Sequence, residues 1–222
     1  MLNKLEIKRA IKQSLAWVSL APRLSNTVLL TFDDGPHPES TPAALRLLKQ
    51  YNARAVFFVV GSRIERAPHL LKTILDEGHA IGNHSYSHPL DNRTPFGSYL
   101  KDLARCQDSI EQLTGERPTF FRPPLGLASF TSLVAPRMLG LTTMLWSIDA
   151  DDWDLKSEEE AQAAAKRLGE KLHASPTRND IVLMHDDHPY VPTILETILP
   201  QLANQNCDLY SALDSIQKRS AA

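Results

Sequence analysis

The stretch TVLLTFDDGP, residues 27 to 36, decides the fold, because an apolar and β-branched run ends at two neighbouring carboxylates. The run predicts a buried β-strand over residues 27–32. Asp33 and Asp34 follow it, and a Gly-Pro pair typical of a turn comes next. Two adjacent acids repel each other, so another group nearby must favour their placement at the end of this strand.

Short β-rich runs alternate with helical patterns along the rest of the chain. The expected strands are residues 27–32, 55–60, 79–83, 119–122, 142–148, 180–184 and 207–211. The expected helices are residues 42–50, 68–77, 97–113, 130–139, 157–173 and 192–204. This alternation predicts parallel strands, in an open doubly wound sheet or a barrel. No Gly-rich phosphate loop follows the first strand, which argues against a nucleotide-binding fold.

Composition favours a single α/β domain and excludes some classes of partner. The chain has 222 residues and is 42% hydrophobic, enough for one sizeable core. A net charge of -2 and scattered basic residues argue against nucleic acid as a partner. The two cysteines, Cys106 and Cys207, are too few for a disulfide framework or a thiolate metal site.

The first 25 residues form an amino-terminal segment before a domain of residues 26–222. Basic residues precede a short apolar stretch, as in a signal peptide, but serines interrupt it and no clean cleavage site follows. Leu5, Ile11, Leu15 and Val18 share one helical face, which predicts an amphipathic helix. We expect this helix to pack on the domain, with membrane-surface binding as the alternative. A cytoplasmic or membrane-peripheral location is favoured over secretion.

Charged and titratable side chains follow five of the expected strands. They are Asp33 and Asp34 after the first strand, His84 and His88 after the third, Arg122 after the fourth, Asp149 and Asp152 (with Trp153) after the fifth, and His185 after the sixth. Functional side chains collect at the carboxyl ends of parallel strands. One such residue is usually a cap or turn, but five strands delivering them to one rim indicate a shared site.

His84 and His88 are the most informative pair. Residues spaced by four share a face of a helix or of an extended segment, so both imidazoles can reach one ion. Two histidines and one carboxylate, with positions left open, form a catalytic metal site. Such a site suits Zn²⁺ or the facial triad of an Fe(II) oxygenase. The second acid beside the ligand favours hydrolysis, which needs a base to take a proton from water.

Five motifs of the chain resemble the signature of the polysaccharide deacetylases, the nodulation-type chitooligosaccharide deacetylase superfamily or carbohydrate esterase family 4. They are TFDDG at 31–35, HSYSH at 84–88, RPPLG at 122–126, DADDW at 149–153 and LMH at 183–185. All five occur in the family's order, and the resemblance covers nearly all of residues 27–211. It implies a single-domain irregular (β/α)7 barrel, consistent with the seven expected strands.

The resemblance also implies a role for each matching residue. The ligands of one divalent ion, most often Zn²⁺, would be Asp34, His84 and His88. The acid-base groups and their partners would be Asp33 as general base, Arg122 beside it, His185 as general acid, and Asp152 with Asp149 orienting His185. The substrate contacts would be Trp153 and Leu183 around the acetyl group, with Leu125 and Pro123 nearby. Leu125 stands where the family commonly has Tyr, which removes a ring that could stack on a sugar.

The implied activity is removal of N-acetyl or O-acetyl groups from an acetylated carbohydrate. One alternative is a related metal-dependent amidase or deformylase that acts on a lipid-linked aminosugar or a small amide. The other is a barrel that binds glycans without turning them over. Loss of a ligand or of the base would favour that second alternative, and the sequence retains both.

Overall fold

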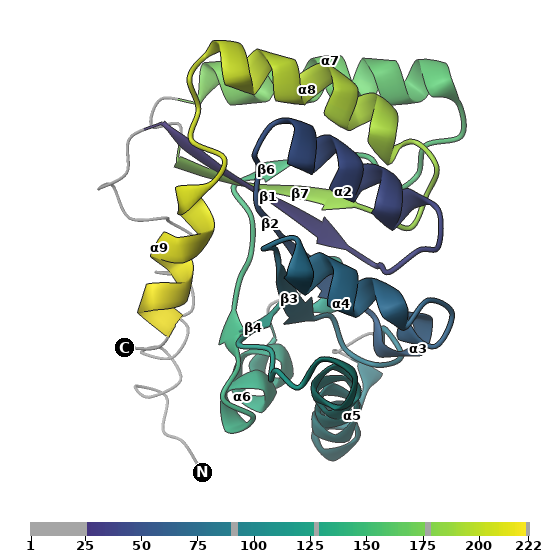
Figure 1. Cartoon of the computed structure of the whole chain (residues 1–222). Coiled ribbons are helices and arrows are strands. Elements are labelled where there is room, and N and C mark those ends of the chain that lie inside the picture. The colour runs from purple at the N-terminus through teal and green to yellow at the C-terminus, as the bar shows by residue number, and fades with distance from the viewer. Residues whose placement is uncertain (1–25, 90–92, 127–128, 176–178, 221–222) are drawn as a thin grey trace.

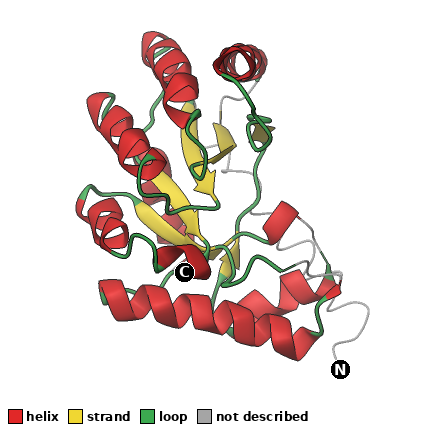
Figure 2. Ribbon diagram, turned by 90° about the vertical axis from the view of Figure 1, so that its right-hand side faces the viewer, coloured by secondary structure: helices red, strands yellow, loops and turns green. Residues whose placement is uncertain are grey.

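The structure is a computed structural model, and it describes residues 26–89, 93–126, 129–175 and 179–220. The amino-terminal segment predicted for residues 1–25 lies outside the described residues. Seven parallel strands form one curved sheet, and helices pack around its outside (Figures 1 and 2). Within the described ranges, no helix combines the length and apolar character needed to cross a membrane. The predicted α/β barrel architecture is confirmed.

The sheet has the strand order β5-β4-β3-β2-β1-β7-β6. In chain order the strands are β1 (Thr27–Asp33), β2 (Ala55–Val59), β3 (Ala80–Asn83), β4 (Phe120–Phe121), β5 (Thr142–Thr143), β6 (Ile148–Asp149) and β7 (Asn179–His185). Every residue of β1 and β2 is buried. Burial on both faces explains why these strands consist of continuous apolar runs and do not alternate with polar residues.

The helices cover the outer face of the sheet. They are α2 (Ser40–Gln50), α3 (Gly61–Ile64), α4 (His69–Asp76), α5 (Phe96–Thr114), α6 (Phe130–Met138), α7 (Glu158–Ala174), α8 (Val191–Asn204) and α9 (Ser211–Ser220), with a 3-10 turn η2 (Pro124–Gly126). Ser157 caps the start of α7, and its hydroxyl accepts a hydrogen bond from the N–H of Glu160. On α8, Ile194, Leu195 and Ile198 recur at helical spacing and are fully buried, each contributing about 1.5–3 kcal/mol.

The strand expected at residues 142–148 is two short strands at opposite edges of the sheet. The N–H of Met144 donates to the carbonyl of Phe121 on one side, and the N–H of Ser147 donates to the carbonyl of Ile181 on the other. Residues 144–147 therefore cross from one edge of the sheet to the other. This crossing closes the barrel without a continuous ladder between β5 and β6.

The prediction of a strand at residues 207–211 is wrong, because this segment forms a single bridge and then the start of a helix. A single bridge joins Asp208 to Thr27, and α9 begins three residues later. The carboxylate of Asp208 accepts hydrogen bonds from the N–H groups of Tyr210 and Ser211. Such capping by a carboxylate starts a helix and ends the extended segment after one bridge.

Candidate active site

One cavity of about 300 Å³ opens at the carboxyl ends of the strands. β1 and β7 are paired so that Asp33 lies opposite His185. The lining residues are Asp33, Asp34, His84, His88, Leu125, Gly126, Trp146, Asp149, Trp153, Leu183, His185 and Asp187. The structure thus brings residues from five separated segments to one place, as the positions of the charged residues after the strands predict.

Asp34, His84 and His88 each offer a ligand atom within 4.8 Å of the others. Asp34 Oδ1 lies 3.7 Å from His84 Nε2 and 3.3 Å from His88 Nε2. That oxygen is buried and has no hydrogen-bond partner in the described part of the chain. A buried carboxylate oxygen beside two imidazoles is unfavourable unless a cation joins them, so these residues fit a divalent metal ion.

His84 is oriented by the chain around it. Its Nδ1 donates a hydrogen bond to the carbonyl of Arg122, 2.8 Å away. Nε2 is therefore directed at Asp34 and His88, which together with His84 are called the ligand group below. Burial lowers the pKa of His84 to about 3, although the charge of Asp34 opposes the shift. The imidazole is therefore neutral at ordinary pH, the form that binds a metal.

Backbone geometry orients the side chains of Asp34 and His88. Asp34 has φ 72° and His88 has φ 53°, both in the left-handed region that non-glycine residues rarely adopt. The segment from His84 to His88 is an irregular turn, and the two imidazoles lie 5.1 Å apart with their planes tilted by 57°. Strained backbone of this kind is typical of functional sites.

Asp33 is paired with a fully buried arginine. Arg122 Nη1 lies 2.8 Å from Asp33 Oδ1, and both side chains are at most 5% exposed. Arg122 also donates to the carbonyls of Met144 and Leu145 in the crossing segment. Burial raises the pKa of Asp33, while the charges of Arg122 and His185 oppose this shift. A carboxylate with a raised pKa is a stronger base than an exposed one.

His185 is held on the other side of the cavity by Asp152. Its Nδ1 lies 2.7 Å from Asp152 Oδ1, and its backbone N–H donates to Asp152 Oδ2. Burial disfavours the charged imidazole, but the hydrogen bond and charge of Asp152 raise the pKa of His185 to about 9. His188 Nε2 lies 3.4 Å from the same carboxylate. Despite burial, these hydrogen bonds lower the pKa of Asp152 to about 2.

Asp149 is in the cavity wall and does not hydrogen-bond to His185. Its Oδ1 accepts a hydrogen bond from the N–H of Asp151, 2.8 Å away. Its charge acts on Arg122, where it favours the protonated guanidinium. The structure therefore separates the two acids that the sequence assigned jointly to His185, and only Asp152 contacts that imidazole.

The predicted substrate residues fall in three different places. Leu183 is 4% exposed and forms part of the inner wall. Leu125 and Trp153 are 64% and 71% exposed, so they line the cavity at its mouth, and the contact of Trp153 with an acetyl group stays a prediction. Pro123 is buried away from the lining, and its carbonyl accepts a hydrogen bond from the N–H of Gly126.

A layer beneath the cavity was missed by the sequence analysis. Asp186 is 1% exposed, its Oδ2 accepts a hydrogen bond from Thr41, and its N–H donates to the carbonyl of Asp33. Burial raises the pKa of Asp186 to about 7. Arg63 pairs with Asp187 and donates to the carbonyl of Asp34. These contacts fix the backbone that carries the first two acids.

Gly35 is required by this layer. A Cβ at Gly35 would lie 2.3 Å from Asp186 Oδ1, and Thr41 holds that carboxyl in place. We expect Gly35→Ala to lower the free energy of unfolding by about 1–3 kcal/mol through overpacking. In an Asp186→Ala background the same substitution should cost much less, because the obstructing carboxyl is gone. Urea unfolding of the four proteins measures both effects, and equal costs in the two backgrounds would contradict this explanation.

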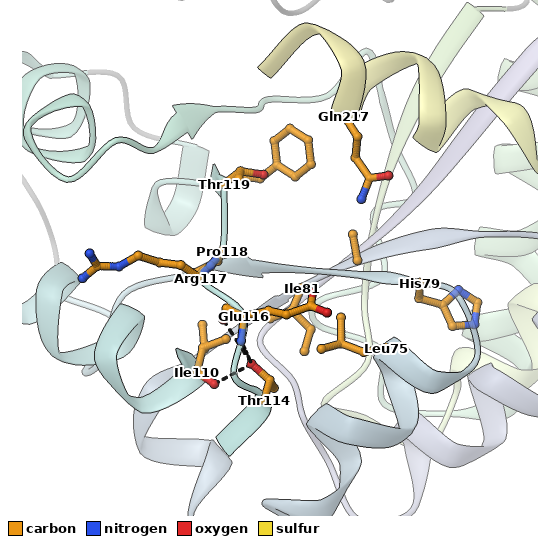
Figure 3. Close-up of a pocket in the computed structure, with 12 residues that line it drawn as sticks. Leu75, His79, Ile81, Ile110, Thr114, Glu116, Arg117, Pro118, Thr119 and Gln217 are labelled. Carbon is orange, nitrogen blue, oxygen red and sulfur yellow. Dashed lines mark hydrogen bonds between the residues drawn. The ribbon is translucent and has the colours of Figure 1, made fainter. Parts of the chain in front are cut away.

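A second cavity, of about 150 Å³, lies at the amino-terminal ends of β3 and β4 (Figure 3). His79 lines it, and Nδ1 of this buried imidazole accepts a hydrogen bond from the N–H of Ala55. Burial lowers the pKa of His79 to about 4, so the ring is neutral. The amino-terminal face of a β/α barrel generally serves stability, which agrees with a structural role for His79.

The fold and the site together define a β/α barrel with three residues that could hold a metal ion beside a carboxylate and a histidine. A family model described as polysaccharide deacetylase matches residues 21–144. The chain belongs to this family, as the five motifs in the sequence predict.

Several relatives match most of this chain. It is 36% identical over 183 residues to the peptidoglycan-N-acetylglucosamine deacetylase PgdA of Listeria monocytogenes, a match over 82% of this chain and 37% of that protein. A peptidoglycan-N-acetylglucosamine deacetylase of Bacillus cereus is 34% identical over 83% of this chain and 85% of its own length. The structure of peptidoglycan deacetylase PdaC from Bacillus subtilis superposes with a TM-score of 0.75 at 32% identity, covering 91% of this chain and 96% of that one.

The chain spans 37% to 40% of the length of the first curated relatives that it matches. The solved PdaC chain, in contrast, is covered almost completely. The shared region is therefore the barrel that carries the site.

Proposed function

We propose that this chain is a metal-dependent hydrolase that removes N-acetyl groups from the aminosugars of a glycan. One observation carries the proposal: Asp33 and His185 lie opposite each other on paired strands and line one cavity with the three-ligand group. An amide hydrolase needs a base for water and an acid for the leaving amine, and these two residues supply them.

The residues of the chain divide the proton transfers between them. Asp33 takes the proton of the attacking water, and Arg122 holds its carboxylate in place. His185 gives a proton to the amine nitrogen as the C–N bond breaks, and Asp152 fixes the imidazole so that Nε2 carries that proton. A divalent ion at the ligand group supplies Lewis acidity and makes water a nucleophile at neutral pH.

We propose Zn²⁺ as the ion, because two imidazoles and one carboxylate with open positions are typical of catalytic zinc. We propose peptidoglycan or a chitooligosaccharide as the substrate class, since relatives of this chain carry those names. The exposed Leu125 and Trp153 at the mouth offer apolar surface to sugar rings. O-acetyl removal remains a second activity that the same site would support.

The test is an activity screen of the Zn²⁺-loaded protein with chitooligosaccharides, peptidoglycan fragments, acetylated xylan and formylated aminosugars. We expect release of acetate and a free amine from N-acetylated glycans, together with about one ion bound per chain. Stripping the metal with a chelator should abolish turnover, and adding Zn²⁺ back should restore it. Binding of these glycans without release of any acyl group would contradict the proposal and favour a non-catalytic barrel.

The cytoplasmic or membrane-peripheral location expected from residues 1–25 stays a prediction, and cell fractionation of the full chain is the measurement that checks it.

A further inference from the structure

The turn that carries His84 and His88 is held mainly by residues outside the five motifs. Ser85 has φ 69° and His88 has φ 53°, so the turn contains two unfavourable backbone conformations. Within the turn, Ser85 Oγ accepts a hydrogen bond from the N–H of His88. This single internal bond leaves the middle of the turn, Tyr86 and Ser87, dependent on neighbouring elements.

Asp102 on α5 binds the middle of the turn. Its Oδ1 accepts hydrogen bonds from the N–H of Tyr86 at 2.8 Å and of Ser87 at 3.2 Å, and its Oδ2 accepts from Ser87 Oγ at 2.7 Å. One carboxylate therefore receives three hydrogen bonds from the two residues that lie between Ser85 and His88. Hydrogen bonds to a charged acceptor are stronger than those between neutral groups.

The carbonyl groups of the turn are bound by α3. The N–H groups of Gly61 and Ser62 donate to the carbonyls of Ser85 and Tyr86, at 3.0 and 2.9 Å. A Cβ at Gly61 would lie 2.3 Å from the ring of Tyr86, so the turn is packed directly against this helix. With its carbonyls bound by α3 and its N–H groups bound by Asp102, the turn has little freedom to change the angle between the two imidazoles.

Tyr86 adds a third restraint. Its hydroxyl donates to Glu65 at 2.6 Å and accepts from Arg105 at 2.8 Å, and the Arg105 guanidinium lies 3.5 Å from the ring centroid. Arg105 comes from the same helix as Asp102. The α5 helix therefore holds both the backbone and the side chain at the centre of the turn.

We propose that Asp102 is a positioning residue for the metal site, which sets the place of His88 relative to His84 and thereby the affinity for the ion. The inference rests on the proposed function, because it takes Asp34, His84 and His88 as the ligands. Asp102 touches neither ligand side chain and acts through the backbone of the turn. Residues that orient ligands from outside commonly change metal affinity when they are replaced.

The experiment measures Zn²⁺ affinity by competition with a chromophoric chelator, and the visible absorption of bound Co²⁺. We expect Asp102→Ala to bind Zn²⁺ about 10- to 100-fold more weakly than wild type. The Co²⁺ spectrum at saturation should also change, because His88 is displaced. Asp102→Asn should recover most of the affinity, since an amide oxygen still accepts the two N–H groups and the amide nitrogen can donate to Ser87 Oγ.

Two residues of the same helix provide controls. Asp108 is exposed, and within the described residues it pairs only with Arg117, so Asp108→Ala should leave the Zn²⁺ affinity and the Co²⁺ spectrum unchanged. Ile110 is buried in the core, so Ile110→Ala should lower stability while the Co²⁺ spectrum stays that of wild type. The proposal would be overturned if Ile110→Ala weakened Zn²⁺ binding and changed the Co²⁺ spectrum as much as Asp102→Ala does. Asp102 would then have only a general structural role.

Ser87→Ala removes one of the three hydrogen bonds and keeps the proposal testable if Asp102→Ala does not fold. It should weaken Zn²⁺ binding by less than Asp102→Ala, and in the same direction. Wild-type Zn²⁺ affinity in both Asp102→Ala and Ser87→Ala would overturn the positioning role of Asp102 and leave the proposed function untouched. A wild-type protein that bound no Zn²⁺, or an His84→Ala variant that kept all of it, would overturn the metal site and the proposed function with it.

Discussion

His185→Ala and Asp33→Asn should each lower kcat for an N-acetylated glycan by about 10²- to 10⁴-fold, the usual scale for a positioned proton-transfer group. Neither residue belongs to the ligand group, so the metal content of both variants should stay at the wild-type value. Because both groups serve the same reaction path, the double variant should lose far less than the product of the two single losses. Initial rates of amine release and metal analysis measure these effects.

An activated aryl acetate separates the acid from the base. Its leaving group departs without a proton, so His185→Ala should be impaired much less on this ester than on the glycan amide. Asp33→Asn should be impaired on both substrates, because each requires deprotonated water. His173→Ala, at an exposed position of α7, is the control and should behave as wild type. Near-normal turnover of the amide by His185→Ala would show that His185 is not the acid.

The pKa of His185 gives the same prediction a pH dependence. Asp152 raises that pKa to about 9 from the ordinary 6.5, so the imidazole is protonated at neutral pH. The stabilisation from the charged pair is complete below about pH 6.5 and is lost as the pH rises through 9. The rate of amide hydrolysis should fall over the same alkaline pH range, as His185 loses its proton. A bound divalent ion would move this fall to lower pH, because its charge repels the proton. In Asp152→Asn the loss of activity at alkaline pH should begin still closer to neutral pH.

Arg122→Met should lower the free energy of unfolding by about 3–5 kcal/mol, because it leaves a buried charge without its partner. Asp33 is 4% exposed and its nearest cation is Arg122. The substitution also removes the donors that satisfy the carbonyls of Met144 and Leu145 in the crossing segment. Urea unfolding at pH 7.5 measures the loss.

A matched control and a second pH identify the cause of this loss. Arg117 is 55% exposed and pairs with two surface acids, so Arg117→Met should change stability by no more than about 0.5 kcal/mol. Without Arg122 the folded-state pKa of Asp33 rises further, and an acid with a raised pKa favours folding at low pH. The destabilisation should therefore be smaller at pH 5 than at pH 7.5. A loss independent of pH would point to packing and not to the unpaired carboxylate.

Most of the fold followed from local patterns in the sequence. The run of residues 27–32 became β1, which is one residue longer, and residues 180–184 became β7 with one more residue at each end. Residues 142–148 contain no glycine or proline that would divide them, so nothing in them shows that their two ends pair with different strands. At residues 207–211 the capping carboxylate of Asp208 outweighed the strand pattern.

The site was predictable where motifs carry it and not where distant contacts build it. The five segments meet at one cavity, as their positions after strands predicted. Thr41 and Asp186 are 145 residues apart, and no local pattern links them. Asp102 belongs to a long helix whose sequence shows only amphipathic spacing. His188 lies outside the five motifs, and the structure puts it against Asp152. Only Asp186 and Asp187, charged residues directly after a strand, offered a signal.

The pairing of β1 with β7 has a consequence for how the protein folds. Thr27 and Asn179 are 152 residues apart along the chain, a larger separation than that of any other strand pair in the described sheet. Contacts between such distant segments carry the largest loop-closure entropy and slow the folding of a domain. This same pairing sets Asp33 opposite His185. A folding intermediate that has formed β1 to β5 but has not docked β7 therefore holds the three ligand residues and the base on formed segments, yet it lacks the acid and the Asp186 and Asp187 contacts that fix Asp33 and Asp34.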